Sequence, residues 1–358
     1  MLYLIHTFNK HWQQLEWQWP KRRIFSSLIS ILEGPLSLGI GGLRRCGKTT
    51  LLKQLIGHFC SKHLPKRSLY FQFDRDLLIK NANALENVLN IYFLDILNES
   101  LGSIQDNVYI FLDEIQFVPM WSEILKRYMD RDPAIRFVVS GSSSLILESD
   151  ATESLAGRMD MIRLRSPDFR DYMIIQGKEP PPEIKHCTDY LDNKNELHLF
   201  YGEKKDLLIH DYLEYLRWGG FPQLKEIPDE NARRRYITDV VVKKILRFDL
   251  PVRFSGENPM DLERLYEIYT TENGQLIEYE TLSRDISLSV FRLKHLSQAL
   301  IAGYLIFYCY NHTKSKRKAG RTGKKVYLST PSLMAHKFGP LEQFPEILGR
   351  IVENDVFL

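Results

Sequence analysis

The residues from Gly42 to Thr50 have the types and spacing of a phosphate-binding loop. They fit the pattern Gly-x-x-x-x-Gly-Lys-Ser/Thr, in which glycines allow a tight turn whose N–H groups bind the α- and β-phosphates of a nucleotide. In that pattern Lys48 reaches the β- and γ-phosphates, and the Thr49 hydroxyl ligates Mg²⁺. The candidate nucleotide-binding residues are therefore Gly42, Leu43, Arg44, Arg45, Cys46, Gly47, Lys48, Thr49 and Thr50.

Apolar residues on both sides of this loop predict a strand before it and a helix after it. Residues 36–40, Leu-Ser-Leu-Gly-Ile, are typical of a short strand, and after the loop apolar residues recur at helical spacing: Leu51, Leu52, Leu55, Ile56 and Phe59. The loop is then expected at a helix N-terminus, where the helix dipole favours anions. A surface turn rich in glycine and lysine is the alternative interpretation, and this context disfavours it.

Asp113 and Glu114 are a second group of residues that could carry out chemistry. They directly follow the apolar run of residues 108–112, Val-Tyr-Ile-Phe-Leu. Such a run predicts a strand that carries Asp113 to the carboxyl edge of a sheet, where it can hold Mg²⁺, usually through water. Glu114 is then placed to orient and deprotonate an attacking water. Glu114 and Lys48 are thus candidate catalytic residues, and Thr49 and Asp113 are candidate metal ligands. Solvated acidic residues in a turn are the alternative.

Two further features downstream are typical of a nucleotide site. The predicted strand of residues 135–140 ends in a serine-rich turn, and Ser140 and Ser142 are candidates to contact the γ-phosphate or the attacking water, with a plain turn as the alternative. Arg158 is a candidate arginine finger, which would supply positive charge as the transferred phosphoryl group becomes more negative. A surface ion pair is the alternative role for Arg158.

The composition is that of an ordinary globular protein: 358 residues, 26% charged and 44% hydrophobic. The net charge of +3 does not by itself imply a polyanionic partner, and four widely spaced cysteines favour neither a disulfide framework nor a zinc site. The apolar start of the chain is too short for a signal peptide, and the longest apolar run, residues 300–310, is about half of a membrane span. We expect a cytoplasmic protein without a membrane partner.

Taken together, these motifs resemble the AAA-type prokaryotic ATPases that are often described as archaeal-type ATP-binding proteins. The likeness covers the phosphate-binding loop, the segment 113–119 with Trp121, and Leu155-Ala156-Gly157-Arg158. Residues 215–222 and 349–354 are similar to the C-terminal domain of unknown function of these proteins. The resemblance implies ATP and Mg²⁺ as cofactors. It implies no cellular role, because the family has no single assigned one.

The sequence departs from that family at two places. Fuller members continue past the segment that corresponds to residues 349–354 into a nuclease-like region, whereas this sequence stops at Leu358. A naturally short chain and a truncated one both remain open, and nuclease chemistry is not expected from the residues present. Residues 176–206 contain Pro180-Pro181-Pro182 and many charges, which predicts a linker or insertion.

The predicted fold class is α/β: a P-loop NTPase of the AAA type whose parallel sheet is sandwiched by helices, followed by a helical lid and a winged-helix domain. The expected boundaries are 1–35 for an N-terminal strap, 36–175 for the ATPase core, 176–206 for the linker or insertion, 207–255 for the lid, 256–335 for the winged helix and 336–358 for a C-terminal segment.

The winged helix is expected from three helical patterns, near 262–269, 279–286 and 290–302, followed by strands near 304–310 and 326–328. Gly303 suits the position after the third helix that requires a left-handed backbone. Polar residues on that predicted recognition helix are Arg292, Lys294, His295 and Gln298, between the apolar Phe291, Leu293, Leu296 and Leu300. The segment between the strands is basic, with Lys314, Lys316, Arg317, Lys318, Arg321, Lys324 and Lys325.

Residues 287–325 are therefore the candidate contact surface for double-stranded DNA, since a recognition helix can enter the major groove while a wing contacts phosphates. Docking of a partner protein is the alternative for this domain. For the whole chain, the leading hypothesis is an ATPase that couples its nucleotide state to the winged helix. A nucleotide-regulated protein-interaction module with little or no turnover is the other candidate. A homo-oligomer is expected if Arg158 acts on a neighbour's nucleotide, and action within its own chain remains open.

Two other kinds of P-loop protein are disfavoured. A GTPase would carry the base-reading pattern Asn-Lys-x-Asp after a core strand, and the nearest match, residues 193–196, lies in the predicted insertion. A small-molecule kinase would not require a carboxylate directed at water, which is the role expected of Glu114.

Overall fold

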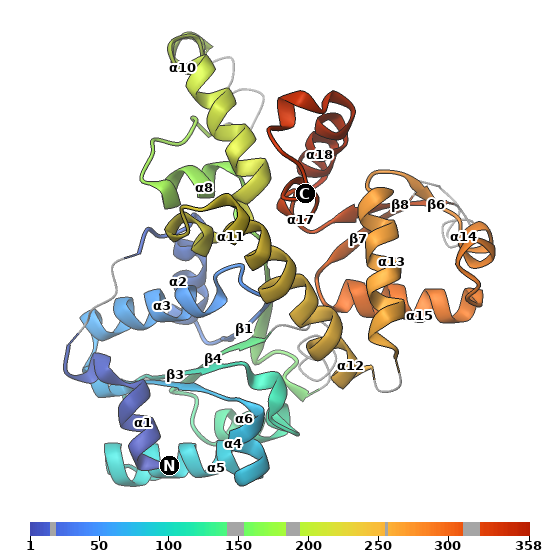
Figure 1. Cartoon of the computed structure of the whole chain (residues 1–358). Coiled ribbons are helices and arrows are strands. Elements are labelled where there is room, and N and C mark those ends of the chain that lie inside the picture. Colours follow the sequence, from blue (N-terminus) through green and yellow to red (C-terminus); the bar gives the residue numbers. More distant parts are fainter. Residues whose placement is uncertain (15–18, 142–153, 184–193, 255–256, 311–322) are drawn as a thin grey trace. The chain divides into compact units, whose positions relative to one another are not determined.

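The computed structural model describes residues 1–14, 19–141, 154–183, 194–254, 257–310 and 323–358 (Figure 1). The chain divides into two compact units, residues 1–43 with 47–165, and residues 44–46 with 166–358. Some residues singled out in the sequence lie outside the described ones, namely Ser142, Lys314, Lys316, Arg317, Lys318 and Arg321.

A parallel sheet of five strands, in the order β2-β3-β4-β1-β5, forms the centre of the first unit. The strands are β1 (Ser37–Gly42), β2 (Ser68–Gln72), β3 (Val108–Asp113), β4 (Ile135–Gly141) and β5 (Met159–Leu164). All residues of β1 and β3 are buried, as expected for parallel strands that are covered on both faces. This confirms the expected α/β sheet. Because β4 lies between β1 and β3, the ends of these three strands meet at one edge of the sheet.

Helices cover both faces of this sheet (Figure 1). They are α1 (Leu2–Phe8), α2 (Phe25–Glu33), α3 (Lys48–Lys62), α4 (Arg75–Lys80), α5 (Ala84–Asn90) and α6 (Trp121–Arg131), with a π-helical continuation of α5 at Ile91–Leu97 and 3₁₀ turns at Lys10–Trp12, Pro65–Arg67 and Ile115–Phe117. On one face Phe59 of α3 stacks on Tyr109 of β3, with ring centroids 3.9 Å apart. On the other face alternate strand residues such as Phe71 and Ile110 join Trp121 and Leu125 in one apolar core.

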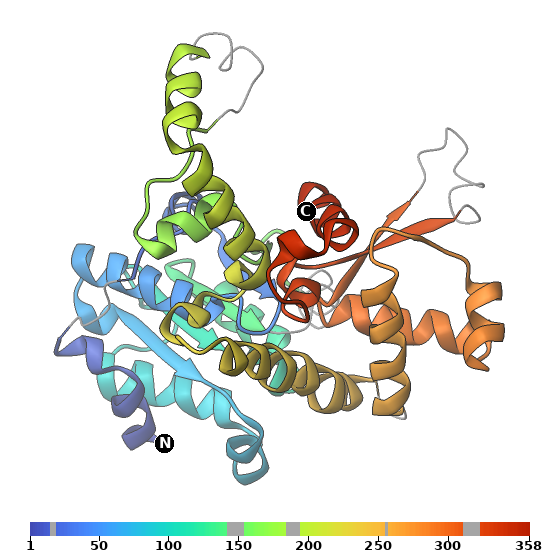
Figure 2. The same cartoon turned by 45° about the horizontal axis from the view of Figure 1, so that its top comes forward.

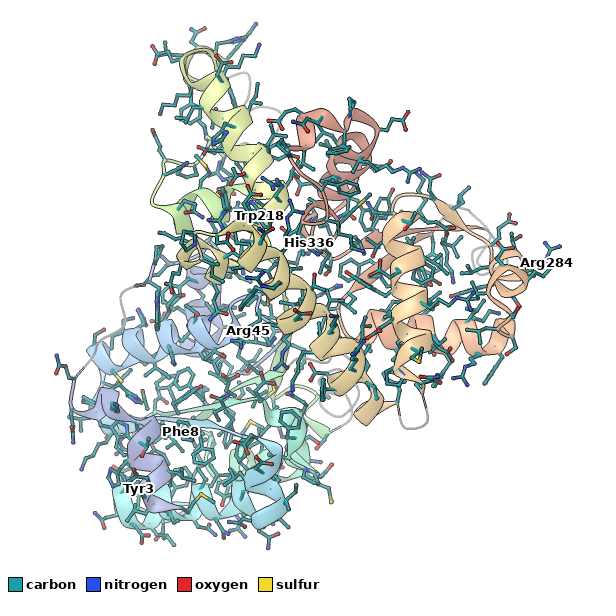
Figure 3. All side chains as sticks on the ribbon, viewed as in Figure 1. Tyr3, Phe8, Arg45, Trp218, Arg284 and His336 are labelled. Atoms are coloured by element: carbon teal, nitrogen blue, oxygen red, sulfur yellow. The ribbon has the colours of Figure 1, made fainter. Side chains whose placement is uncertain are left out.

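The N-terminal segment packs on the edge strand β2. The Asn9 side chain bonds both backbone groups of Tyr70, accepting from its N–H at 2.6 Å and donating to its carbonyl at 2.8 Å. Trp12 donates to the Ser68 carbonyl at 2.7 Å. Phe8, labelled in Figure 3, packs edge-on against Phe71 at 5.2 Å between centroids. A single side-chain amide thus takes the place of a neighbouring strand at this edge.

The second unit begins with helices. They are α8 (Phe169–Gln176), α10 (Lys194–Glu214), α11 (Glu230–Arg235) and α12 (Leu250–Arg253), with π-helical turns at Tyr215–Gly219, Tyr236–Val242 and Ile245–Asp249 and a 3₁₀ turn at Pro222–Glu226. Residues 194–206, which were expected to belong to a linker or insertion, are the first half of α10. This stretch contains many charged residues with good helix propensity. It was not expected to be helical because it has no regular apolar spacing and follows the prolines at 180–182.

Close packing explains the two glycines of the segment Trp218-Gly219-Gly220. A Cβ atom on Gly219 would lie 2.3 Å from the Tyr215 ring, and one on Gly220 would lie 2.2 Å from the Thr330 hydroxyl. Trp218, labelled in Figure 3, stacks under the Arg217 guanidinium at 4.6 Å from the ring centroid. Since Arg217 is buried and forms a 2.7 Å ion pair with Glu230, this segment joins the start of α11 to the end of α10.

The described residues between 259 and 328 form three helices and three strands in the order helix, strand, helix, helix, strand, strand. The elements are α13 (Pro259–Thr271), β6 (Leu276–Ile277), α14 (Tyr279–Ile286), α15 (Val290–Ala302), β7 (Ile306–Tyr310) and β8 (Lys324–Leu328). The strands pair antiparallel in the order β6-β8-β7. Figure 2 shows the β7–β8 pair beside α13 and α15. The helix ranges of α14 and α15 agree with those expected from the sequence.

The role expected of Gly303 is wrong in one respect. Gly303 has a φ of −74°, and Tyr304 instead takes the left-handed conformation, with a φ of 56°. A Cβ atom on Gly303 would lie 3.1 Å from Ile245 and 3.2 Å from Leu250. The glycine therefore permits close packing of α15 on the preceding helices rather than a left-handed turn.

The C-terminal segment is tied to strand β8 by the residues Glu353 and Asn354. It consists of α17 (Ser332–Ala335), a 3₁₀ turn at Leu341–Gln343 and α18 (Pro345–Phe357). The Asn354 side chain accepts from the Leu328 N–H at 2.9 Å and donates to the Leu328 carbonyl at 3.0 Å. Glu353 accepts from Lys325 at 2.8 Å and from the Tyr327 hydroxyl at 2.7 Å. The end of the sequence segment 349–354 thus anchors α18 to the sheet.

Candidate functional site

The phosphate-binding loop joins the end of β1 to the start of α3. β1 ends at Gly42 and α3 begins at Lys48. Gly47 takes a left-handed φ of 104° and Arg45 a φ of 67°, which is rare for a residue with a side chain. These conformations place the loop at the free N–H groups that begin α3, where anions bind in other proteins.

Lys48 is buried at the base of this loop. Its ammonium donates to the Gly42 carbonyl at 2.9 Å and to the Leu43 carbonyl at 3.0 Å, and only 6% of the residue is exposed. A lysine held over a loop of this kind is placed to meet phosphate oxygens. The positive charge is therefore fixed at the loop by the fold and does not depend on a mobile surface side chain.

The carboxylate of Asp113, at the end of β3, joins three strands and a helix. Asp113 is fully buried, and its Oδ2 accepts from the Thr49 hydroxyl at 2.6 Å and from the Tyr70 hydroxyl at 3.1 Å. Its Oδ1 accepts from the Ser140 hydroxyl and from the Glu114 N–H at 3.1 Å. The structure thus brings Thr49, Asp113 and Ser140 together as their positions at the sheet edge predict.

At Glu114, the residue after β3, the backbone leaves the direction of the strand. It has a left-handed φ of 55°, and its Oε2 accepts from the Gln116 side chain at 2.5 Å. A residue with a side chain rarely takes this conformation, and such backbone strain is concentrated at functional sites. The glutamate is only partly buried, unlike Asp113, so that it can reach solvent.

Two residues of this site, Tyr70 and Gln116, were missed by sequence reasoning. Burial and the nearby charge of Asp113 raise the pKa of the Tyr70 phenol well above its ordinary value, so that Tyr70 remains a hydrogen-bond donor. In the sequence Tyr70 is one more apolar residue of a buried strand. Its role could be found only from the register that pairs Gln72 with Asp113 and Tyr70 with Phe111.

The donors at this edge suit a magnesium ion. A buried carboxylate and a hydroxyl, Asp113 and Thr49, lie in direct contact, and hard oxygen donors are what Mg²⁺ prefers. Among the described residues, no cluster of three or more His, Cys, Asp or Glu side chains is arranged to hold a metal. A magnesium site completed by phosphate and water oxygens fits this small protein contribution, since Mg²⁺ is rarely held by protein ligands alone.

Arg158 lies at the amino ends of the strands, whereas Thr49, Asp113 and Ser140 lie at their carboxyl ends. It immediately precedes β5, whose first residue Met159 pairs with Ser37 at the start of β1. The phosphate-binding loop follows the other end of β1, about 17 Å away at 3.3 Å per residue. The Arg158 guanidinium pairs with Asp130 at 2.5 Å, and both side chains are about two-fifths exposed. Within one chain Arg158 therefore does not face the loop, and a role as arginine finger stays a prediction about a neighbouring chain.

Of the five charged residues that were expected to face DNA and that the structure describes, three are paired with carboxylates within the second unit. Arg292 forms an ion pair with Asp261 at 2.8 Å, and His295 contacts Glu257 at 2.7 Å. Lys325 is paired with Glu353, as described above. Phe291, expected among the apolar residues of the helix, is 83% exposed. The part of α15 that remains open to a ligand is therefore the face with Phe291, Lys294 and Gln298.

Comparison with known proteins identifies the fold of the part of the chain that carries the phosphate-binding loop. Residues 36–173 match a family described as an AAA domain, and residues 209–342 match one described as a domain of unknown function. Residues 36–173 have the fold of an AAA-type P-loop NTPase. The strand order around the loop and the positions of Thr49 and Asp113 in this AAA domain agree with that assignment.

The relatives of the chain are themselves uncharacterized proteins. Two of them, from Methanocaldococcus jannaschii, are each 27% identical, over 332 and 308 residues, which is 89% and 83% of this chain. A Haemophilus influenzae protein is 24% identical over 254 residues, or 69% of the chain. The matched regions are 65%, 62% and 54% of the relatives, so the chain spans less than two thirds of their length.

Solved structures with a related arrangement include a variant of Thermotoga maritima RuvB and the Aeropyrum pernix ORC1 protein in complex with DNA. The first has a TM-score of 0.37 at 14% identity, covering 85% of this chain and 90% of that one. The second has a TM-score of 0.32 at 14% identity, covering 92% and 94%. Likenesses of this size carry no argument about function. In the described parts of the chain, every helix is too short or too polar to span a bilayer.

Proposed function

We propose that the AAA domain binds ATP with Mg²⁺ and hydrolyses it to ADP and phosphate. The observation that carries this proposal is the pair Asp113 and Glu114. The Asp113 carboxylate is buried against Thr49, whereas Glu114 has a left-handed backbone and a partly exposed side chain that bonds to Gln116. Two adjacent carboxylates in such different environments suit two different tasks, metal binding and proton transfer.

The residues of the site would divide the work as follows. Lys48 and the N–H groups of residues 42–50 would hold the phosphates, and Thr49 and Asp113 would hold Mg²⁺, whose charge stabilises the phosphoryl oxygens. Glu114 would orient a water molecule and accept its proton. Ser140, bonded to Asp113 from the strand between the two motifs, would sense the γ-phosphate at the same edge. Gln116 would hold Glu114 in place until that proton transfer.

Replacing Glu114 by glutamine tests the assignment most directly. Glu114→Gln keeps the shape of the side chain and removes the base, so we expect MgATP binding to persist while turnover falls at least roughly a hundredfold. Phosphate release in steady state and binding of a fluorescent ATP analogue measure the two quantities. Glu123→Gln, at an exposed glutamate in the first turn of α6, is the matched control. Single-turnover rates of Glu114→Gln close to those of the unaltered protein would reject Glu114 as the base.

A regulatory module that binds nucleotide with little or no turnover is the competing function. The same assay separates the two, because such a module would bind MgATP and release no phosphate above background. The presence of Glu114 beside the buried Asp113 favours the hydrolase, since a site that only binds nucleotide needs no second carboxylate that can reach water.

For residues 257–328 we propose a winged helix that contacts DNA. The support is the order of the described elements α13, β6, α14, α15, β7, β8 with a three-stranded antiparallel sheet, in which α15 would be the recognition helix. The pairing of Arg292 and His295 with carboxylates limits the contact to the remaining face of α15 and to the hairpin. The binding experiment of the next subsection also tests this proposal.

A further inference from the structure

A groove in the second unit is lined by aromatic rings and lysines from four elements. It has a volume of about 610 Å³ and lies between α14, α15 and the β7–β8 hairpin. Its lining includes Tyr279, Lys294, Gln298, Tyr308, Tyr310 and Lys324. Neither the AAA domain nor the proposed ATP chemistry uses these residues.

The tyrosines of the groove are held rigidly by one another. The Tyr308 hydroxyl lies 2.9 Å from that of Tyr269 and 3.2 Å from that of Tyr279, and the Tyr269 hydroxyl lies 2.7 Å from the buried Ser297. Tyr310 continues the row beyond Tyr308, with ring centroids 6.2 Å apart, and is 55% exposed. Rings fixed in this way lose little conformational entropy when a flat ligand stacks on them.

Lysine ammonium groups already lie over these rings. The Lys324 ammonium is 3.9 Å from the ring centroid of Tyr279 and 4.2 Å from that of Tyr308. It also donates to the Tyr279 hydroxyl at 2.8 Å. The Lys294 ammonium lies 5.7 Å from the Tyr279 centroid. A cationic ligand, such as a lysine-rich peptide, would meet two positive charges here. A ligand that combines a flat aromatic system with negative charge is complementary to both the rings and the lysines.

The shape of the surface favours a strand of nucleic acid over a single nucleotide. Phe291, Lys294, Gln298 and Ile301 follow one another on one face of α15, a stripe about 15 Å long at 1.5 Å per residue. The 83% exposed Phe291 supplies a further ring at the start of this stripe. Glu278 and Glu280 also line the groove, and their carboxylates can accept hydrogen bonds from the amino groups of unpaired bases.

We infer that this groove binds unpaired bases of a single nucleic-acid strand, with the exposed Tyr310 ring stacking on a base and Lys294 and Lys324 contacting phosphates. This inference rests on the proposed contact of residues 257–328 with DNA and specifies its partner. In a duplex the faces of the bases are stacked on one another, whereas bases of a single strand are free to stack on side chains. The protein should therefore prefer single strands, ends or junctions over continuous duplex.

Fluorescence anisotropy of the full chain with labelled oligo-dT of about 20 nucleotides, and with a duplex of equal length, tests the inference. The unaltered protein should bind the single strand more tightly. Tyr310→Leu removes the exposed ring and keeps apolar bulk, so it should weaken single-strand binding roughly fivefold to a hundredfold. Tyr310→Phe keeps the ring and should bind as the unaltered protein does. Lys294→Gln removes one cation that faces a phosphate, so it should flatten the log–log salt dependence by about 0.7.

Arg284→Gln is the matched control, because Arg284 is an exposed cation on α14 outside the groove (Figure 3), and it should change neither quantity. Duplex binding that equals or exceeds single-strand binding, or a Tyr310→Leu variant with unchanged affinity, would overturn the inference and leave the DNA proposal standing. No binding to either nucleic acid at low salt would overturn both, and the ATPase assay would be unaffected by that outcome.

Discussion

Asp113 is the residue on which the geometry of the AAA domain converges. It accepts hydrogen bonds from Thr49, Tyr70 and Ser140 on three different elements while it is fully buried. A buried carboxylate with several donors has one orientation, since rotating it would leave donors unpaired at a cost of about 1–3 kcal/mol each. The orientation of the proposed metal ligand is therefore set by its neighbours.

Tyr70→Phe tests whether a single hydroxyl helps to orient the Asp113 carboxylate. The ring is kept and one bond to Asp113 is removed, so the Mg²⁺ concentration that gives half-maximal ATP turnover should rise about twofold to tenfold. Tyr92→Phe is the control, because it removes a comparable buried hydroxyl whose 2.7 Å bond goes to the Lys66 carbonyl, away from Asp113. A Mg²⁺ dependence shared by Tyr70→Phe and the unaltered protein would contradict the assigned role.

His336 makes the second unit sensitive to acid. Burial lowers the pKa of this histidine from 6.5 to about 4, against a smaller opposing effect of the bond that its Nδ1 makes with the Ser332 carbonyl. Since the unfolded chain takes up the proton near pH 6.5 and the folded chain does not until about pH 4, stability falls as pH decreases through this window.

Urea unfolding at pH 7 and pH 5 measures this effect. The free energy of unfolding should drop by about 2 kcal/mol more for the unaltered protein than for His336→Gln, which cannot titrate. The comparison concerns only the change with pH, so a constant loss of stability in the variant does not affect it. Equal pH dependence in the two proteins would show that His336 is not kept neutral by burial.

At the scale of elements, Asn354 fixes helix α18 to strand β8 through one side chain. Asn354→Ala removes the partner of the Leu328 carbonyl, while the Leu328 N–H keeps its 3.1 Å bond to Asn273, and should destabilise the second unit by about 1–3 kcal/mol in urea unfolding. Asn231→Ala, at an exposed position of α11, should change stability by less than about 0.5 kcal/mol. A similar small change for Asn354→Ala would mean that α18 is held by its apolar contacts instead.

The elements could be predicted where one pattern dominates their sequence. β3 and α14 were expected at their observed positions because an apolar run or a strong helical period marks them. Residues 194–206 were not, since a charged helix carries no apolar stripe. Contacts between elements could not be predicted for a different reason. The bonds of Tyr70 to Asp113 and of Arg292 to Asp261 depend on strand register and helix packing, which no local sequence pattern encodes.

At the scale of the whole molecule, the position of Arg158 predicts that a monomer and an assembly differ in activity. Because Arg158 lies at the sheet edge opposite to the loop, it can serve as an arginine finger only for the nucleotide of another chain. We expect activity per subunit to rise with protein concentration. Mixing Arg158→Ala with Lys48→Ala protein should restore part of the activity, since each chain supplies what the other lacks.

The size of the loss distinguishes the two roles of Arg158. An arginine finger contributes a factor of roughly 10³ to 10⁵ in rate, and Arg158→Ala should lower turnover on that scale. Asp130→Asn, which breaks the ion pair and keeps the arginine, should leave turnover near that of the unaltered protein. A loss below about tenfold for Arg158→Ala would assign Arg158 to the surface ion pair with Asp130.

Asn9 has a consequence for the behaviour of the protein in concentrated solution. β2 is a terminal strand of the sheet, and Tyr70 would otherwise offer its N–H and carbonyl to any extended chain that came near. The amide of Asn9 occupies both groups at once, and the segment around it covers the strand. The first dozen residues therefore act against edge-to-edge aggregation, in a protein whose sheet would otherwise be open to polymer growth on this side.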